Sequence, residues 1–232
     1  MELVQACKQA LVLLFSGNGD LWTIIGISFA VSVKAIAIAT PIALATAFVL
    51  AFFRFPGRGL ALSTVNTLLS LPAVVVGLTL YLLLSRSGPL GDLRLLFTQK
   101  AMMIGQIVLC FPLLVAWSHA AIEAAERSAW ETAITLGAPP WRAVLTLLHE
   151  VRFGLIAAVI AGFGRIISEV GSSMMVGGNI LNYTRNIPTA IALETSKGSF
   201  AQGIALGFVL LFLAFGLNLG LSFFQRRVTP AS

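Results

Sequence analysis

Apolar stretches close to twenty residues long, with few or no charges, recur along the whole chain. A helix of about 20 such residues crosses the hydrocarbon core of a bilayer. The chain has 232 residues, of which 58% are hydrophobic and only 10% are charged, so it is far more apolar than an ordinary soluble protein. The sequence therefore predicts an all-α integral membrane protein, whose length sets a number of helices rather than of soluble domains.

Hydropathy divides the chain into five predicted spans and two short flanking pieces. Residues 1–20 are expected to form an interfacial N-terminal segment, residues 21–226 a single transmembrane domain, and residues 227–232 a tail. Five crossings place the two termini on opposite sides. The predicted spans are Leu21 to Phe53, Leu60 to Leu84, Ala101 to Trp117, Phe153 to Val176 and Ile204 to Phe224.

The basic residues indicate topology rather than nucleic-acid binding. The net charge is +6, but most Lys and Arg lie beside apolar segments and form no basic face with aromatic residues between. Alternate connections carry similar numbers of Lys and Arg, so the positive-inside rule barely decides the orientation. Cys7 and Cys110 lie far apart in apolar surroundings, a spacing that predicts neither a metal site nor a disulfide.

The segment between the third and fourth spans, residues 121–150, is amphipathic and too charged for the hydrocarbon region. Gly137 offers a left-handed helix end, and Pro139 and Pro140 cannot continue the preceding helix. The pattern predicts a helix, a tight corner and a second short helix from Trp141 to Leu148. We call residues 121–150 the elbow. The residues alone leave two interpretations open: the elbow lies on lipid headgroups, or it docks into a partner.

The elbow stretch "ETAITLG" resembles the EAA loop of ATP-binding-cassette (ABC) importer permeases. The resemblance extends over "GPLGDLRLLFT", "GFGRIISEVGSSMMVGGNI" and "TRNIPTAIALETS", and so covers most of the chain from about residue 25 onward. These stretches are most similar to tungstate importer permeases. Thr132 replaces the usual alanine of the motif, which makes a generic sugar or amino-acid permease a poorer match.

The resemblance implies a five-helix bundle of the type I ABC importer permease kind, with the EAA elbow in the cytoplasm and the N-terminus outside a prokaryotic inner membrane. It implies a homodimer, two separate ABC ATPase subunits and an extracytoplasmic oxyanion-binding protein. Coupling to the ATPases would fall on the elbow residues Glu131, Ala133, Gly137, Ala138, Pro139 and Trp141.

Two charges stand inside the fourth predicted span. Arg165 lies about 18 Å along that helix from Phe153, near the middle of a core ~30 Å thick. Glu169 follows at i+4, so the two side chains share a face and each offsets the charge of the other. Two interpretations stay open: a structural ion pair, and a pathway in which Arg165 attracts a divalent oxyanion while Glu169 tempers its binding.

Three further residues are candidates for the pathway. Lys34, the one charge of the first span, is expected near the outer interface, where its side chain can reach the headgroups. Asn179 and Thr184 follow the fourth span and offer neutral hydrogen bonds near an external mouth.

The chain has no phosphate-binding loop of the G-x-x-x-x-G-K-[ST] type, so ATP and Mg²⁺ are expected on the partner ATPase and no cofactor on this chain. A molybdate or sulfate permease is the nearest alternative. A secondary transporter is less favoured because no inverted repeat is evident. A membrane enzyme built around His119 or His149 is disfavoured because no catalytic motif surrounds them.

Overall fold

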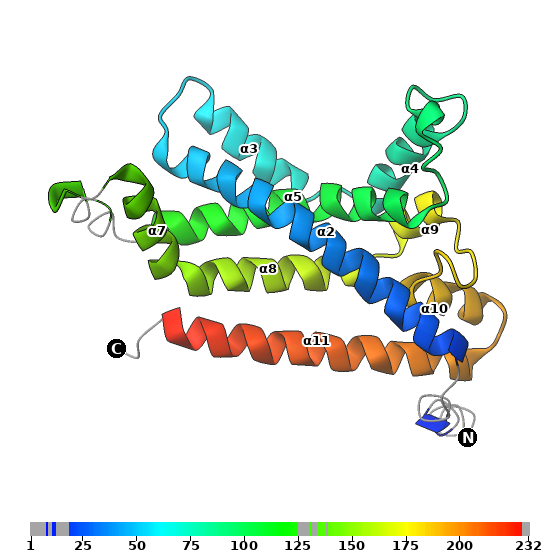
Figure 1. The fold of residues 1–232 in the computed structure, drawn as a ribbon. Helices are drawn as coiled ribbons and strands as arrows, with labels where there is room; N and C mark the ends of the chain where they lie inside the picture. The colour runs from blue at the N-terminus through cyan, green and yellow to red at the C-terminus, as the bar shows by residue number, and fades with distance from the viewer. Residues whose placement is uncertain are drawn as a thin grey trace.

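The computed structural model describes residues 8, 11–12, 19–124, 130, 134–137 and 139–228. These residues form helices and connecting turns only, as predicted for an all-α protein (Figure 1). The interfacial segment predicted for residues 1–20 falls almost entirely outside the described residues, as do the last four residues of the tail. The helices are α2 (Gly19–Phe52), α3 (Arg58–Leu68), α4 (Ala73–Leu84), the short 3-10 helix η1 (Gly91–Leu93), α5 (Gln99–Ala124), α7 (Pro140–Glu150), α8 (Arg152–Ile167), α9 (Gly171–Gly177), α10 (Ile187–Ser196) and α11 (Phe200–Val228).

Helices α2 and α5 make the most extensive contact of the bundle, and α8 packs on both. A row of small residues on α2 explains the close approach, because side chains four positions apart share one helix face. Ala35, Ala39, Ala43 and Ala47 form this row, and all four are fully buried. They lie in a core that includes Leu114 and Val115 of α5 and Ile166 of α8. Pro41 stands within α2 without ending it.

The second predicted span is wrong as a single helix. The chain bends by 100° between α3 and α4, at a break that includes Leu71 and Pro72. The two helices diverge from the same side of the bundle as two arms (Figure 1). Proline explains the local break, because it has no backbone N–H to continue the hydrogen-bond ladder and disfavours helical geometry in the residue before it.

The fourth predicted span, Phe153 to Val176, is also not one helix. Helix α8 ends at Ile167, and α9 begins at Gly171. Side chains satisfy backbone groups at this break: Ser168 Oγ donates to the carbonyl of Gly164, and the carboxylate of Glu169 accepts from the N–H of Gly171. Polar side chains of this kind allow a helix to be interrupted inside a membrane protein.

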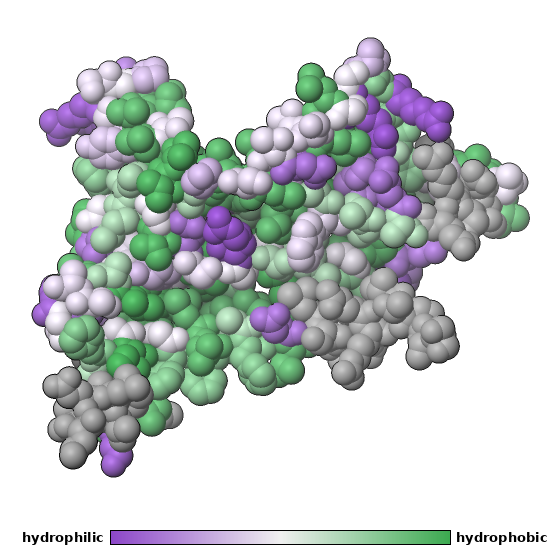
Figure 2. Space-filling model, turned by 180° about the vertical axis from the view of Figure 1, so that it is seen from behind, coloured by the Kyte–Doolittle hydropathy of each residue, from purple (hydrophilic) through white to green (hydrophobic). Residues whose placement is uncertain are grey.

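Three described helices, α2, α5 and α11, are long and apolar enough to cross a membrane, and the number rises to five if each bent pair counts as one span. Apolar surface covers much of the face in Figure 2, whereas hydrophilic groups lie at its two upper ends and in smaller patches near its middle. The start of α2 and the end of α11 lie at opposite ends of the bundle (Figure 1). We call these the α10 end, which also carries α9 and the tip of α4, and the α7 end.

Candidate translocation and coupling sites

Among the described residues of the elbow, Gly137 has the left-handed backbone that the sequence predicts. Gly137 adopts a φ of 83°, in the left-handed region that favours glycine, and its N–H donates to the carbonyl of Ile134. Pro139 is extended and precedes α7, which is bent by 68° from α8. Glu131, Ala133 and Ala138 are outside the described residues. The described residues of the elbow thus contain a left-handed turn at Gly137 and a bend between α7 and α8.

The described residues of the elbow include side chains that pack against the bundle and others that are exposed. Ala143 and Leu147 of α7 are buried, and Trp130 packs against Phe48 and Phe52 near the end of α2. By contrast, Leu136 is 81% exposed and Trp141 is 59% exposed. Large apolar side chains exposed in this way are typical of a surface that a partner protein or the membrane covers.

Arg165 and Glu169 form the predicted ion pair, with 2.8 Å between Arg165 Nη1 and Glu169 Oε2. They do not share one helix, because Glu169 lies two residues beyond the end of α8. The other carboxylate oxygen, Oε1, accepts from the N–H of Gly171 at 2.7 Å. Glu169 thus joins the guanidinium of α8 to the first turn of α9.

The two partners of this pair differ in exposure. The Glu169 side chain is 8% exposed, whereas 41% of the Arg165 side chain remains accessible. The carboxylate is therefore enclosed by the chain itself, and the guanidinium presents a free side to whatever lies beside α8.

Asn179 and Thr184 lie in the connection from α9 to α10, where their side chains hold the loop. The Thr184 hydroxyl is fully buried, donates to the carbonyl of Gly177 and accepts from the N–H of Ile180. Asn179 adopts a φ of 51° and its amide donates to the carbonyl of Thr189. In this conformation the Thr184 hydroxyl has no free side to offer to an anion.

Lys34 lies on the exposed side of α2 and lines a cleft with a volume of about 510 Å³. Arg94 and Lys100 line the same cleft, from the loop before α5 and from the first turn of α5. No motif or local pattern in the sequence marks these two residues as part of a site. They lie about 60 positions from Lys34 in the sequence, and only the packing of α2 against α5 brings the three residues together. A local sequence pattern therefore cannot reveal the cluster.

The described residues contain no group of three or more His, Cys, Asp or Glu side chains that could hold a metal ion. His119 lies instead beside Glu123, 3.4 Å from its Oε1, and the same oxygen pairs with Arg58 at 2.9 Å. This cluster joins the start of α3 to the end of α5.

Solved structures with a similar fold are subunits of ABC transporters. One amino acid ABC transporter with histidines superposes with a TM-score of 0.66 at 15% identity, covering 93% of this chain and 97% of that one. The inward-facing MetNI methionine ABC transporter gives a TM-score of 0.64 at 16% identity, covering 90% of this chain and 94% of that one. At such identities the likeness shows the fold alone, and it confirms the predicted fold class of an ABC permease.

Curated relatives are closer in sequence. The chain is 44% identical over 211 residues to the tungstate uptake system permease TupB of Campylobacter jejuni, covering 91% of this chain and 88% of that protein. It is 36% identical over 216 residues to TupB of Peptoclostridium acidaminophilum, covering 93% and 95%. The molybdenum permease ModB of Escherichia coli K12 is 30% identical over 178 residues, covering 73% and 78%. No family model matches.

The two TupB matches and the two structural matches each cover 90 to 93% of this chain, so sequence and fold point to the same class of protein. The protein is a multi-pass membrane permease of the ABC transporter class. It belongs to the family of tungstate uptake permeases represented by TupB, with ModB as a more distant relative.

Proposed function

We propose that the chain is the membrane subunit of an importer that moves tungstate inward, driven by separate ATPase subunits. The observation that carries this proposal is the 44% identity to a tungstate uptake permease over 91% of the chain. The chain itself supplies no phosphate-binding loop, so ATP and Mg²⁺ bind to the partner subunits. Its own role is transport and not catalysis.

The elbow is the contact with the ATPase in this proposal. Gly137 fixes a sharp corner, and the exposed Leu136 and Trp141 provide an apolar surface to dock. Helix α7 continues into α8 after a single residue, so movement of the elbow is passed directly to the helix that carries Arg165. The elbow end of the bundle is then cytoplasmic, the N-terminus is outside, and the membrane is the prokaryotic inner membrane.

The accessible side of Arg165 supports a second copy of the chain beside α8. An arginine at the hydrocarbon centre that faces lipid costs about 2.5 to 3.5 kcal/mol on insertion scales. Its side chain is 41% exposed although Glu169 already pairs with it. A homodimer that encloses a hydrated path at this face removes the lipid contact and sets two such guanidinium groups along the route of a divalent anion. An extracytoplasmic binding protein delivers the anion at the α10 end.

A molybdate permease is the second candidate, because ModB shares 30% identity over 73% of this chain. The two oxyanions are both tetrahedral and divalent, so the chain's own charges do not separate them. The larger identity to TupB makes tungstate the preferred substrate.

The test compares cellular tungsten, molybdenum and sulfur in a strain that lacks this chain and in strains restored with wild type, Gly137→Asp or Gly57→Asp. Both glycines have positive φ, at 83° and 91°, and a Cβ at either would meet no atom within 4 Å. The two variants therefore carry a similar backbone strain, but only Gly137 lies in the elbow. We expect wild type and Gly57→Asp to restore tungsten uptake and Gly137→Asp to leave it at least about tenfold lower.

The outcomes separate substrate from coupling. If the deleted strain lacks only molybdenum or only sulfur, the chain is still a permease but its substrate is molybdate or sulfate. Equal rescue by both glycine variants removes the elbow from the mechanism. Equal tungsten content in the deleted and restored strains contradicts tungstate import itself. Immunoblots of the membrane fraction check that the variants insert to the same level.

A further inference from the structure

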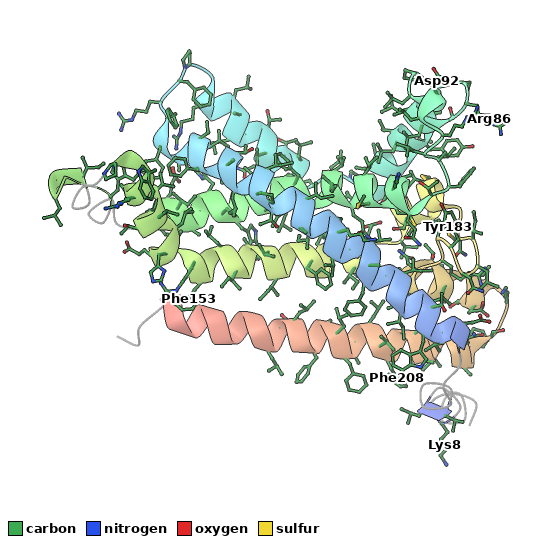
Figure 3. The ribbon with its side chains drawn as sticks, in the orientation of Figure 1. Lys8, Arg86, Asp92, Phe153, Tyr183 and Phe208 are labelled. Atoms are coloured by element: carbon green, nitrogen blue, oxygen red, sulfur yellow. The ribbon has the colours of Figure 1, made fainter. Side chains whose placement is uncertain are left out.

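A cleft with both polar and apolar walls lies where α2 passes the start of α5, and it is built by parts of the chain far apart in sequence. Its volume is about 510 Å³. Three cationic side chains line it: Lys34 of α2, Arg94 of the loop before α5, and Lys100 of α5. Its neutral polar groups come from Thr98, Gln99 and Tyr183. Tyr183 lies at the α10 end of the molecule, the end opposite Phe153 (Figure 3).

The charge of this cleft is not balanced by the part of the chain that the structure describes. Three cationic side chains line it and no carboxylate does. Elsewhere, Arg58, Arg165 and Lys197 each pair with a glutamate within 3.0 Å. Among the described residues, the side chains of Lys34, Arg94 and Lys100 have no such ion pair. All three are exposed at the mouth of one cleft, and an anion bound between like charges is attracted by each of them and lessens their mutual repulsion.

The start of α5 adds to the positive potential. The first turn of this 26-residue helix contains Lys100 and no acidic residue. A cation in a first turn opposes the helix dipole, whose positive end is at the N-terminus. Lys100 is therefore in an unfavourable position for helix stability alone, and an anion in the cleft makes it favourable.

The walls of the cleft are held by contacts that do not involve its three cations. Val31 of α2 packs in a core cluster with Ala101, Met102 and Val176. The amide of Gln99 donates to the carbonyl of Tyr183 at 2.7 Å, which ties the start of α5 to the loop after α9. The Thr98 hydroxyl donates to the carbonyl of Leu95 and accepts from the N–H of Ala101. These contacts hold the walls without the three cations, and walls held in this way lower the cost of binding a ligand.

We propose that this cleft binds one free divalent tetrahedral oxyanion, such as tungstate, at the α10 end of the protein. Charge matching favours this ligand over a phospholipid headgroup. A phosphodiester carries one negative charge and leaves two of the three cations unbalanced, whereas a divalent oxyanion leaves one. Lys34 and Lys100 bind as point charges and Arg94 as a planar donor, a set that suits a compact anion with four oxygens.

The inference rests on the proposed function for the identity of the anion and for the outer position of the α10 end. It adds a site where the anion is held on this chain before it crosses, away from the Arg165 and Glu169 pair.

The test measures tungstate binding by isothermal titration calorimetry to the whole transporter, with its ATPase subunits and without nucleotide, in nanodiscs of phosphatidylcholine. We expect Lys34→Gln, Arg94→Gln and Lys100→Gln each to weaken binding at the cleft by about tenfold, because each removes a charge-assisted contact. The triple variant is expected to lose that binding event. Arg86→Gln is the matched control, since Arg86 is an exposed cation at the same end that does not line this cleft.

Binding by the ATPase subunits is common to all variants and is subtracted through the triple variant. Lys34→Arg and Lys100→Arg keep the charge, so their retained affinity shows that charge and not folding is responsible for a loss. Equal tungstate affinity in wild type and in the triple variant overturns the proposal. A second pair of results also overturns it. Added phosphatidylglycerol would abolish tungstate binding, and native mass spectrometry would find phosphatidylglycerol bound to wild type but not to the triple variant.

This test is independent of the uptake test. If cells without the chain take up tungsten normally while tungstate binding at the cleft depends on the three cations, the proposed function is contradicted and the proposed binding site stands. If uptake depends on the chain but the triple variant binds and transports tungstate as wild type does, the proposed binding site is contradicted and the proposed function stands.

Discussion

The bundle contains two helix breaks that lie against each other and are built from different chemistry. Between α3 and α4 the break is made by backbone groups and Pro72. The Pro72 carbonyl accepts from the N–H groups of Val75 and Val76, and no side chain caps α4. Between α8 and α9 the break carries Ser168 and Glu169, and the carboxylate bonds both Arg165 and the backbone of Gly171.

The difference shows that a charge is not required to interrupt a span in this protein. The α3 to α4 bend of 100° is formed by neutral groups. The second break could be built in the same way, so its carboxylate has a further role, namely to offset the charge of Arg165 beside it. The two breaks meet where α4 packs on α9.

The contact between the two breaks is the most sensitive to added volume. A Cβ on Gly77 of α4 would lie 2.8 Å from the Cα of Ser172 in α9, which is backbone and cannot rotate away. We expect Gly77→Ala to destabilise the fold by about 3 kcal/mol through overpacking. Unfolding by SDS titration in mixed micelles measures the change in the free energy of unfolding.

Gly171→Ala is the matched control for this contact. Its Cβ would lie 2.9 Å from Val74 Cγ2, the end of an exposed side chain that can change rotamer. We expect a loss below about 1 kcal/mol for this variant. Equal losses for Gly77→Ala and Gly171→Ala would contradict the view that backbone contact at Gly77 locks the two breaks together.

The charged break is tested by separating its two bonds. Glu169→Ala removes the acceptor for Gly171 and the partner of Arg165, and we expect it to cost about 2 kcal/mol. Glu169→Gln keeps an oxygen for Gly171 but removes the charge, so we expect about half that loss. The same SDS titration measures both variants.

Transport adds a second measurement on the same pair. If Glu169 tempers anion binding along a path, Glu169→Gln slows tungsten uptake more than its modest loss of stability explains. Uptake by Glu169→Gln equal to wild type, with Glu169→Ala unfolding readily, would leave the pair a purely structural role. Restored uptake in the double variant Arg165→Met with Glu169→Gln would show that the unpaired arginine, and not the missing carboxylate, causes the defect.

The sequence predicted the class of the fold because its signal is the length of the apolar stretches, which the bilayer imposes. It also predicted the corner at Gly137 and the pairing of Arg165 with Glu169, since both depend on residues near each other in the chain. The family resemblance that it carried is confirmed by the TupB relatives.

The misses have one physical cause. Phe153 to Val176 carries no charge apart from the pair and is mostly apolar, so hydropathy cannot show that α8 stops at Ile167. The stop is stabilised by the Glu169 carboxylate, which accepts from the N–H of Gly171, and by the packing of α9 on α4. Pro72 indicates a break in the second predicted span, but the angle of the bend depends on where α3 and α4 pack. The cluster of Lys34, Arg94 and Lys100 needs the α2 and α5 contact, which no local pattern contains.

The neutral break gives the smallest expected effect. Pro72→Ala frees the backbone N–H and the backbone dihedral angle that proline fixes, and the larger entropy of the unfolded chain lowers stability by about 0.4 to 1 kcal/mol. The bend itself is expected to persist, because α4 stays packed on α9 and α3 on α5. Spin labels at the exposed positions Leu60 and Leu82 report the distance between the two arms by pulsed electron paramagnetic resonance. An unchanged distance places the cause of the bend in tertiary packing, whereas a longer distance shows that Pro72 alone keeps α3 and α4 from joining into one straight helix. Pro41→Ala in the continuous helix α2, with the same pair of labels, controls for the general effect of removing a proline from a span.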